Sequence, residues 1–292
     1  MVTMKILLTG ATGFLGRNLL LELLNYYKVR CITRNKLDVN HKNLEIISGD
    51  ITNKHDVDKS MKDIDYAIHA AAVIQDTDEK AFNVNVNSTK NLIGSAKKFN
   101  IKKFIFISTE NVIYDYCQDA YTNSKREAEK IVETFKNYLI LRPSVIYGKD
   151  DDRYVSYMVK YIKRHFIVPI LGYGKNLIQP VYVKDLSKCI INSLKYNIQG
   201  TYTVCGADSV SYRDIVKTIK KTLNLRRFIF YIPLFIVKPM IYFYEKLVKN
   251  PKIKFASLIY LNYNRKHDIS HIIKVFKYKP TALKDGIKEI IS

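Results

Sequence analysis

The segment from Thr9 to Gly16 constrains the fold more than any other part of this chain. It reads Thr-Gly-Ala-Thr-Gly-Phe-Leu-Gly and connects an apolar run, Lys5–Thr9, to an amphipathic stretch, Phe14–Leu24. Glycines in such a turn let the backbone bend sharply and approach a ligand, and the following helix N-terminus favours negative charge. The order of strand, turn and helix predicts a dinucleotide pyrophosphate site, rather than a ligand-free turn, at Gly10, Thr12, Gly13, Phe14, Leu15 and Gly16.

The rest of the first half continues the same alternation. Apolar runs typical of buried parallel strands occur at Lys5–Thr9, Val29–Thr33, Leu44–Ile47, Tyr66–His69, Phe104–Ile107 and Tyr138–Leu141. Helical patterns occur at Phe14–Leu24, His55–Met61, Glu79–Lys98 and Thr122–Phe135. Alternating strands and helices predict an α/β fold, a Rossmann-like doubly wound parallel sheet.

The second half is less regular. A strand at Tyr202–Val204 and a helix at Ser211–Leu223 are expected, and Gly172–Asn176 is expected to form a turn. We therefore predict an NAD(P)-binding domain over residues 1–165. A smaller substrate-binding lobe, partly interleaved with the sheet, is expected over residues 166–292.

Three further strand ends carry candidate cofactor ligands. Arg34 follows the second strand, with Asp38 four residues later, and an arginine there suits the 2′-phosphate of NADP, whereas an acidic residue suits the ribose of NAD. We therefore expect NADP, with NAD as the alternative. Asp50 and Ile51 follow the third strand, where the carboxylate can bind the adenine or form only a turn. Ala70, Ala71 and Ala72 end the fourth strand, where small side chains admit the cofactor ribose.

A tyrosine and a lysine four residues apart form the candidate catalytic pair. Only two of the 22 tyrosines have this spacing, Tyr121 with Lys125 and Tyr242 with Lys246. The first pair begins a helix and follows a strand that ends in Ser108 and Thr109, whose hydroxyls can bond a substrate oxygen. A tyrosine of pKa ~10 needs about 4 kcal/mol of phenolate stabilisation to act near pH 7. A lysine and a positively charged nicotinamide can supply it.

The chain resembles the short-chain dehydrogenase/reductase superfamily, in the extended or atypical branch that includes the NAD-dependent epimerase/dehydratase family. The resemblance covers nearly the whole chain and rests on TGATGFLG at 9–16, GD at 49–50, HAAA at 69–72, NVNSTKNL at 85–92, FISTE at 106–110, YTNSK at 121–125, LRPSVIYG at 141–148 and QPVYVKDL at 179–186. It implies that Asn85 orders the active site and Tyr121 is the acid/base. By the same resemblance, Lys125 holds the ribose and lowers the tyrosine pKa, and Pro143 and Ser144 adjoin the nicotinamide. Thr109 is the first choice for the hydroxyl partner and Ser108 the second. A homodimer through helices 79–98 and 122–135 is also implied.

Two departures from the family pattern bear on the reaction. Glu110 and Asn111 follow Thr109 where sugar-nucleotide dehydratases have an Asp-Glu pair, which argues against dehydration. Only eleven residues separate Thr109 from Tyr121, fewer than in typical sugar epimerases. The leading hypothesis is an NAD(P)-dependent epimerase or reductase for a nucleotide-activated sugar, bound at the carboxyl edge of the sheet along Gly172–Asn176 and Gln179–Asp185. The alternatives are an NADPH-binding accessory or assembly protein, resembling a subunit of respiratory complex I, and an alcohol reductase for a non-sugar substrate.

Composition restricts the partners. The net charge of +21 comes from scattered lysines without a nucleic-acid-binding motif, so nucleic acid is not expected as a partner. Four widely spaced cysteines and the pair His267 and His271 predict neither a disulfide framework nor a metal site, and a cytoplasmic protein without a signal peptide is expected. Residues 228–244 are apolar and aromatic, but Pro233 and Pro239 are expected to break any long helix. This segment is expected to pack into the second lobe, with a membrane interface as the alternative.

Overall fold

The computed structural model describes residues 4–74, 82–151, 153–248, 258 and 262–292. Its contacts divide the chain into two compact units. Unit 1 comprises Met1–Pro143, Val183–Val204 and Ser270–Lys279, and unit 2 comprises Ser144–Tyr182, Cys205–Ile269 and Pro280–Ser292. The contacts thus place residues 144–165 in unit 2, whereas the sequence-based division assigns them to the first domain.

Unit 1 is built on one parallel sheet. Its strands are β1 (Lys5–Thr9), β2 (Lys28–Thr33), β3 (Leu44–Ser48), β4 (Tyr66–His69), β5 (Lys103–Ile107), β6 (Tyr138–Pro143) and β11 (Gly200–Val204). They are ordered β11-β6-β5-β4-β1-β2-β3, and every neighbouring pair is parallel. This confirms the predicted doubly wound α/β fold. The strand order reverses between β1 and β4, the point where such sheets bind ligands beyond their carboxyl ends.

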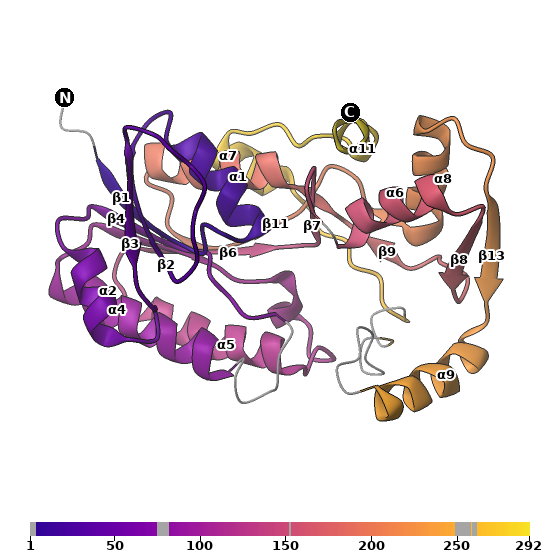
Figure 1. Cartoon of the computed structure of the whole chain (residues 1–292), viewed down its shortest axis with the longest axis horizontal. Coiled ribbons are helices and arrows are strands. Elements are labelled where there is room, and N and C mark those ends of the chain that lie inside the picture. The colour runs from indigo at the N-terminus through magenta and orange to yellow at the C-terminus, as the bar shows by residue number, and fades with distance from the viewer. Residues whose placement is uncertain (1–3, 75–81, 152, 249–257, 259–261) are drawn as a thin grey trace. The chain divides into compact units, whose positions relative to one another are not determined.

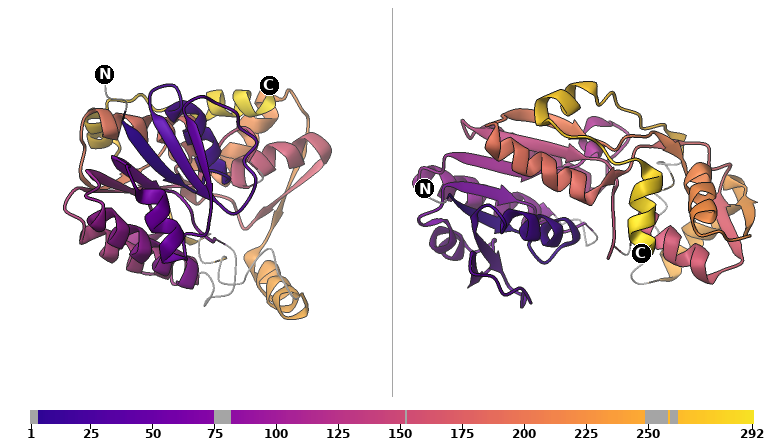
Figure 2. Two further views of the ribbon diagram at one scale, coloured as in Figure 1. Left: turned by 60° about the vertical axis from the view of Figure 1, so that its left-hand side comes forward. Right: turned by 90° about the horizontal axis from the view of Figure 1, so that it is seen from above.

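Helices cover both faces of this sheet. They are α1 (Phe14–Leu23), α2 (Lys54–Met61), the π-helical turn η1 (Asn83–Asn87), α4 (Ser88–Lys98), the 3₁₀ turn η2 (Glu110–Ile113), α5 (Ala120–Glu133), α7 (Val183–Lys195) and α10 (Ser270–Phe276). Helices α1 and α7 lie on one face, and α2, α4 and α5 lie on the other (Figures 1 and 2). The four helices predicted in this half are confirmed, except that residues 79–81 lie outside the described residues and Asn83–Asn87 is π-helical.

The core of unit 1 explains why its strands read as continuous apolar runs. All five residues of β5 are buried, because a central parallel strand is covered on both faces. Phe104, Phe106 and Ile140 pack with Ala128 and Val132 of α5 in one cluster. The same packing fixes α5 against β5 and β6, the strands whose carboxyl ends carry Ser108, Thr109 and Pro143.

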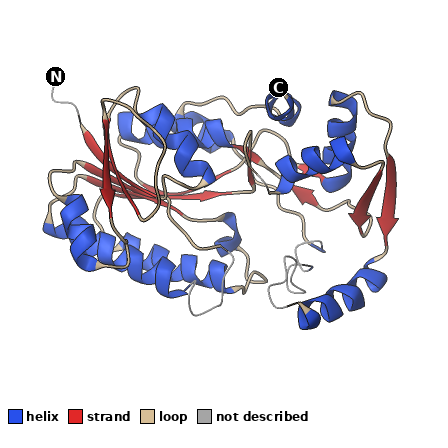
Figure 3. Ribbon diagram, in the orientation of Figure 1, coloured by secondary structure: helices blue, strands red, loops and turns tan. Residues whose placement is uncertain are grey.

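Unit 2 combines three two-stranded ribbons with four helices among its described residues (Figure 3). The strands are β7 (Ile146–Tyr147), β8 (Ile167–Leu171), β9 (Leu177–Ile178), β10 (Val181–Tyr182), β12 (Val210–Ser211) and β13 (Phe228–Ile232), paired as β10-β7, β12-β9 and β13-β8. The helices are α6 (Tyr154–Arg164), α8 (Tyr212–Thr222), α9 (Leu234–Leu247) and α11 (Leu283–Ile291). Gly172 and Gly174 both have positive φ angles, 64° and 59°, which confirms the turn predicted between β8 and β9.

One expectation for residues 228–244 is wrong. Pro239 does not break the helix, because α9 begins at Leu234, directly after Pro233, and continues through Pro239 to Leu247. The segment packs into unit 2 through Val237 and Ile241, the buried residues of α9, while much of the rest of the helix is exposed. Among the described residues, none of the helices has both the length and the apolar character needed to cross a bilayer.

Candidate active site

The glycine-rich turn has the geometry of an anion site. Gly10 adopts a φ of +77°, and a Cβ there would lie 2.5 Å from the Ala71 nitrogen, so only glycine fits between β1 and the end of β4. At Gly16, a Cβ would collide with the Gly10 carbonyl, which explains the close approach of α1 to the turn. In contrast, a Cβ at Gly13 would contact only the Gly10 oxygen, at 3.3 Å. Open space therefore remains in front of Gly13.

The N-terminus of α1 borders this space. Its N-cap is Gly13, which offers no side-chain cap, and its first turn contains no acidic residue. The first amides of a helix have no intrahelical partner and carry a partial positive charge. A pyrophosphate would fit both features, so the residues present suit the dinucleotide that the sequence predicts.

A buried chain of hydrogen bonds through Thr9, His69 and Thr89 supports the glycine-rich turn. The amide of Ala71 donates to Thr9 Oγ1 (3.3 Å), and Thr9 Oγ1 lies 2.7 Å from His69 Nδ1. On the other side of the ring, His69 Nε2 lies 3.2 Å from Thr89 Oγ1, which donates to the Asn85 carbonyl (2.7 Å). Because the Thr89 hydroxyl donates its proton to the Asn85 carbonyl, its oxygen must accept a hydrogen bond from Nε2–H of His69. The proton of the neutral ring is therefore on Nε2, and Nδ1 accepts from the Thr9 hydroxyl. This assignment needs a neutral imidazole, and burial, aided by the Lys125 charge, lowers the pKa of His69 well below its ordinary value.

Arg34 and Asp50 lie together at the ends of β2 and β3. Arg34 Nη1 is 3.2 Å from Asp50 Oδ2, while Asp50 Oδ1 accepts from the amide and hydroxyl of Thr52, at 2.9 and 2.8 Å. Burial alone would raise the pKa of Asp50, but the Thr52 hydrogen bonds and the Arg34 charge hold it below its usual value. The Arg34 side chain is 70% exposed and can still bind a ligand, whereas Asp38 pairs with Lys36 at 2.9 Å.

Helix α5 presents the Tyr121/Lys125 pair. Asp119 caps the helix by accepting from the amide of Thr122 (2.9 Å), so α5 begins at Ala120 and Tyr121 lies in its first turn. Residues four apart share one helix face, which confirms the predicted helical setting of Tyr121 and Lys125. The other pair with this spacing, Tyr242 and Lys246, lies on α9, with the ammonium 4.5 Å from the ring centroid.

Lys125 is a charged group held in the core. Its side chain is 2% exposed, and Nζ donates to the carbonyl of Ile107, the last residue of β5, at 2.7 Å. The ammonium also lies 4.4 Å from the centre of the Phe106 ring. Burial lowers the pKa of Lys125 to about 7, although the Glu129 charge opposes the shift. Two of its three protons remain for a ribose hydroxyl or a phenolate.

Asn85 connects the loop after β4 to helix α5. Its Oδ1 accepts from the Val73 amide (2.8 Å), and its Nδ2 donates to the Val73 carbonyl (3.0 Å) and to Ser124 Oγ (2.9 Å). Ser124 in turn donates to the Tyr121 carbonyl at 2.7 Å. Asn85 lies in the π-helical turn η1, a conformation frequent at functional sites. The segment after Ala72 is thereby held against the first turn of α5.

The two candidate hydroxyls after β5 have different surroundings. The Ser108 amide donates to the Leu141 carbonyl (2.7 Å), while its buried Oγ has no partner among the described residues. Thr109 Oγ1 caps η2 by accepting from the Asn111 amide at 3.3 Å, which leaves its proton available for another acceptor. Either hydroxyl can therefore hydrogen-bond a substrate oxygen.

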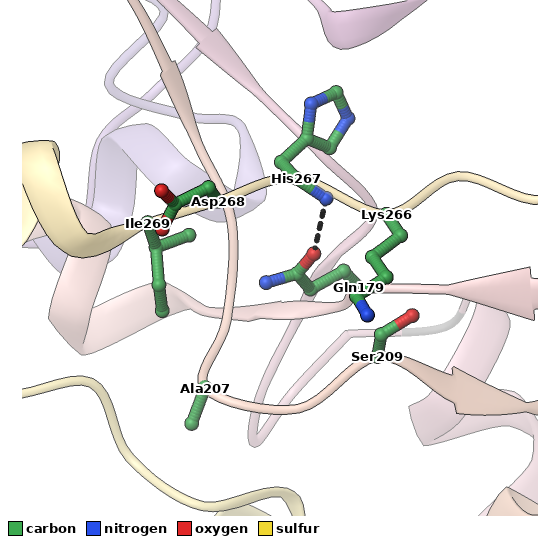
Figure 4. Close-up of a pocket in the computed structure, with 7 residues that line it drawn as sticks. All are labelled: Gln179, Ala207, Ser209, Lys266, His267, Asp268 and Ile269. Carbon is green, nitrogen blue, oxygen red and sulfur yellow. Dashed lines mark hydrogen bonds between the residues drawn. The ribbon is translucent and has the colours of Figure 1, made fainter.

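Unit 2 has a pocket of its own, about 340 Å³ in volume (Figure 4). Gln179 stands at its wall, accepting from the His267 amide (2.9 Å) and donating to the Gly206 carbonyl (2.9 Å). The other lining residues are Ala207, Ser209, Lys266, His267, Asp268 and Ile269. Gln179 thus lies in a pocket, whereas Asp185, which the sequence places beside it, is buried in α7 of unit 1.

Several of these groups have no clear signal in the sequence. The side chains of His69, Thr89 and Ser124 form the supporting network. All three lie within motifs that carry the family resemblance, but the sequence does not show that they bond to one another or to Asn85. Lys266 and its neighbours were missed as pocket residues because no motif marks them. Pro143 ends β6 in unit 1, while Ser144 begins unit 2, where its hydroxyl donates to the Gln179 carbonyl at 2.5 Å.

Fold and site together define a class. A doubly wound parallel sheet with an uncapped glycine turn at its switch point is the architecture that binds dinucleotides. A family model described as the NAD dependent epimerase/dehydratase family matches residues 6–205. The chain belongs to this family.

The similar proteins include two kinds of enzyme. A 3-beta-hydroxysteroid dehydrogenase of Mycolicibacterium neoaurum is 26% identical over 67% of this chain, and the match spans 62% of that relative's length. The UDP-glucose 4-epimerase of Vibrio cholerae is 25% identical over 98% of this chain and 94% of its own length. Among solved structures, UDP-glucuronic acid 4-epimerase from Bacillus cereus, in complex with UDP-glucuronic acid and NAD, is 23% identical with a TM-score of 0.78, covering 98% of this chain and 97% of that one.

Proposed function

We propose that this protein is an NAD(P)-dependent enzyme that oxidises and re-reduces, or reduces, the sugar of a nucleoside diphosphate sugar. One observation carries the proposal. The buried Lys125 ammonium is fixed at the end of β5, one helical turn from Tyr121, at the carboxyl edge of a dinucleotide-binding sheet. Nothing in the fold requires a charge at this buried position, because an uncharged side chain of similar volume would pack there at lower cost.

The proposed roles follow from the positions of the side chains. Tyr121 takes a proton from a sugar hydroxyl, and the adjacent Lys125 charge stabilises the phenolate. When bound, the nicotinamide supplies a hydride acceptor and donor. Thr109, or alternatively Ser108, donates a hydrogen bond to the substrate oxygen, and Asn85 positions α5 through Ser124. In an epimerase Tyr121 returns the same proton once the configuration has inverted, so no net oxidation occurs.

Arg34 supports a preference for NADP. Its exposed guanidinium stands at the end of β2, and a guanidinium binds a 2′-phosphate through charge-assisted hydrogen bonds. The remaining proposed cofactor contacts are those of the glycine turn, of Asp50 and Ile51, of Ala70–Ala72, and of Pro143 and Ser144.

Two observations support a nucleotide sugar as the substrate. The sugar epimerases match nearly the whole chain, including unit 2, whereas the hydroxysteroid dehydrogenase matches two thirds of it. In unit 2, Lys266 lines a pocket and is next in sequence to Arg265, which is 7% exposed, and cations of this kind suit a diphosphate. The steroid relative nevertheless makes a hydroxysteroid the second candidate substrate.

The test is a screen of the purified full chain. Cofactors released by denaturation are identified by mass spectrometry, and uridine-, thymidine- and guanosine-diphosphate sugars are then added to the NADP- or NAD-loaded protein. We expect one of them to raise the melting temperature and to be converted, as seen by NMR. A ligand at ~100 times its dissociation constant adds ~2.7 kcal/mol of stability.

Controls separate the alternatives. Tyr121→Phe should keep the thermal shift and lose conversion. Oxidation of a 3β-hydroxysteroid in place of any sugar would establish the second candidate. If the cofactor alone shifts the melt and no substrate is turned over, the protein is a non-catalytic cofactor-binding subunit and the proposed reaction is wrong.

A further inference from the structure

Helix α9 has two apolar faces, and the described residues of the chain pack against only one of them. Val237 and Ile241 contact Leu171 and Ile232 at the ends of β8 and β13, in a small cluster that also includes Leu258. A second stripe follows the spacing i, i+4, i+7 and i+11, so its members share another face of the helix. Ile236, Met240, Phe243 and Leu247 form this stripe, with exposures of 42%, 63%, 60% and 84%.

The ribbon of β8 and β13 extends the exposed apolar surface. The two strands are parallel, with Phe228 opposite Ile167 and Phe230 opposite Pro169. Residues paired in this way point to the same side of a ribbon, and Phe228, Phe230 and Ile167 are all more than half exposed. Since β13 runs directly into α9, the exposed side chains of β13 and the stripe follow one another along the chain in unit 2, and β8 lies beside β13 (Figure 1). We call this surface the apolar strip.

A basic groove adjoins the start of the apolar strip. It has a volume of about 640 Å³, and its lining residues are Lys217, Lys220, Lys221, Asn224, Leu225 and Arg226. No acidic residue lines it, although Asp214 lies 3.8 Å from Lys217. Arg226 is only two residues before Phe228, so the cations end where the aromatic side chains begin. On α9 itself, Lys238 and Lys246 are exposed beside the stripe.

We propose that the apolar strip and the basic groove together dock unit 2 on the surface of an anionic lipid bilayer. Aliphatic and aromatic side chains flanked by lysines match the boundary between acyl chains and headgroups, where lysine stems extend towards the phosphates. The helix has 14 residues and is about 21 Å long, shorter than a ~30 Å hydrocarbon core, so it lies on the bilayer and does not span it.

Charge argues against the other occupants. A second copy would bring a chain of net charge +21 against the same basic groove, which is unfavourable. The phosphates of a nucleic acid would neutralise the lysines and the arginine of the groove. They would offer no apolar surface to bury the side chains of Ile236, Met240 and Leu247. An anionic lipid bilayer can both bury the side chains of the apolar strip among its acyl chains and neutralise the basic groove with its headgroups.

The test is flotation of the cofactor-loaded full chain with vesicles of phosphatidylcholine, with and without 30% phosphatidylglycerol. We expect the anionic vesicles to bind the protein at least tenfold more tightly, with the difference reduced by 0.5 M NaCl. Met240→Glu with Phe243→Glu should abolish binding. Leu21→Glu with Tyr26→Glu, in unit 1, is the matched control, because those side chains are 58% and 63% exposed.

A second pair of variants tests the groove without touching apolar residues. Lys221→Glu with Arg226→Glu should remove the preference for anionic vesicles, whereas Lys59→Glu with Lys62→Glu, an equal change of charge in unit 1, should keep it. Absence of binding, or equal losses in test and control variants, would overturn the proposal. The proposal would also be overturned if the wild type without vesicles were a dimer that the Met240/Phe243 variant dissociates. Binding of an oligonucleotide by the wild type that this variant abolishes would overturn it as well.

Discussion

Replacing Lys125 by methionine is expected to stabilise the cofactor-free protein below neutral pH and to lose this advantage as the pH rises. Methionine keeps most of the side-chain volume but has no charge to bury. The pKa of Lys125 is lowered from 10.5 to about 7 by burial, and a difference of that size corresponds to about 5 kcal/mol. Against this gain, the Ile107 carbonyl loses its hydrogen bond, which costs about 1–3 kcal/mol.

The sign follows from proton binding. Between pH 7 and pH 10.5 the unfolded chain keeps the proton of Lys125 and the folded protein does not, so the wild type gains stability as the pH rises through this window. Below pH 7 both states are protonated and the full cost of burying the charge remains. The methionine variant should therefore be more stable by about 2–4 kcal/mol at pH 6 and lose most of this difference by pH 10.

Urea unfolding of the cofactor-free wild type and variant at pH 6, 7.5, 9 and 10 measures this difference. Lys90→Met is the matched control, because Lys90 is exposed on α4, and its effect on stability should not vary with pH. Groups that titrate in both proteins cancel in the comparison. A Lys125→Met effect that is constant from pH 6 to pH 10 would refute the argument that burial perturbs this lysine.

Three further predictions concern the same unit. Arg34→Ala should weaken NADP binding by roughly 10- to 100-fold, since a hydrogen bond to a charged group is worth about 1.5–3 kcal/mol, while calorimetry should show NAD binding unchanged; equal losses for both cofactors would contradict the assignment. Tyr121→Phe should lower turnover by ~10²–10⁴-fold with little change in cofactor affinity, and retained activity would mean that another group is the base. The pKa of His69 in the folded protein is lowered well below 6.5. As the pH falls below about 6.5, His69 is therefore protonated in the unfolded chain but not in the folded protein, and the wild type should lose stability. His69→Gln should lack that part of the pH dependence, and an unaltered acid transition would show that His69 does not titrate as its burial requires.

Much of unit 1 was predictable from the sequence, because its signals are local. Buried parallel strands read as short apolar runs, and the glycines at 10 and 16 mark a turn whose geometry leaves no room for a side chain at either position. The spacing of Tyr121 and Lys125 follows from the helical repeat alone. Helix α7 and the ribbons of unit 2 were nevertheless missed. Four of the ribbon strands, β7, β9, β10 and β12, have only two residues each and leave no periodicity to detect.

Other properties depend on segments that are far apart in the chain. The state of Lys125 depends on the carbonyl of Ile107, 18 residues away, and on the packing that excludes water from both. Asn85 acts on α5 only because the fold brings it to Ser124, 39 residues along the chain. The exposure of α9 is likewise decided by the pairing of β13 with β8, which gives the helix one surface to cover and leaves its second apolar face outside. Periodicity in a sequence shows which side chains share a face, but burial, and with it pKa and binding, is set by what the tertiary structure places against that face.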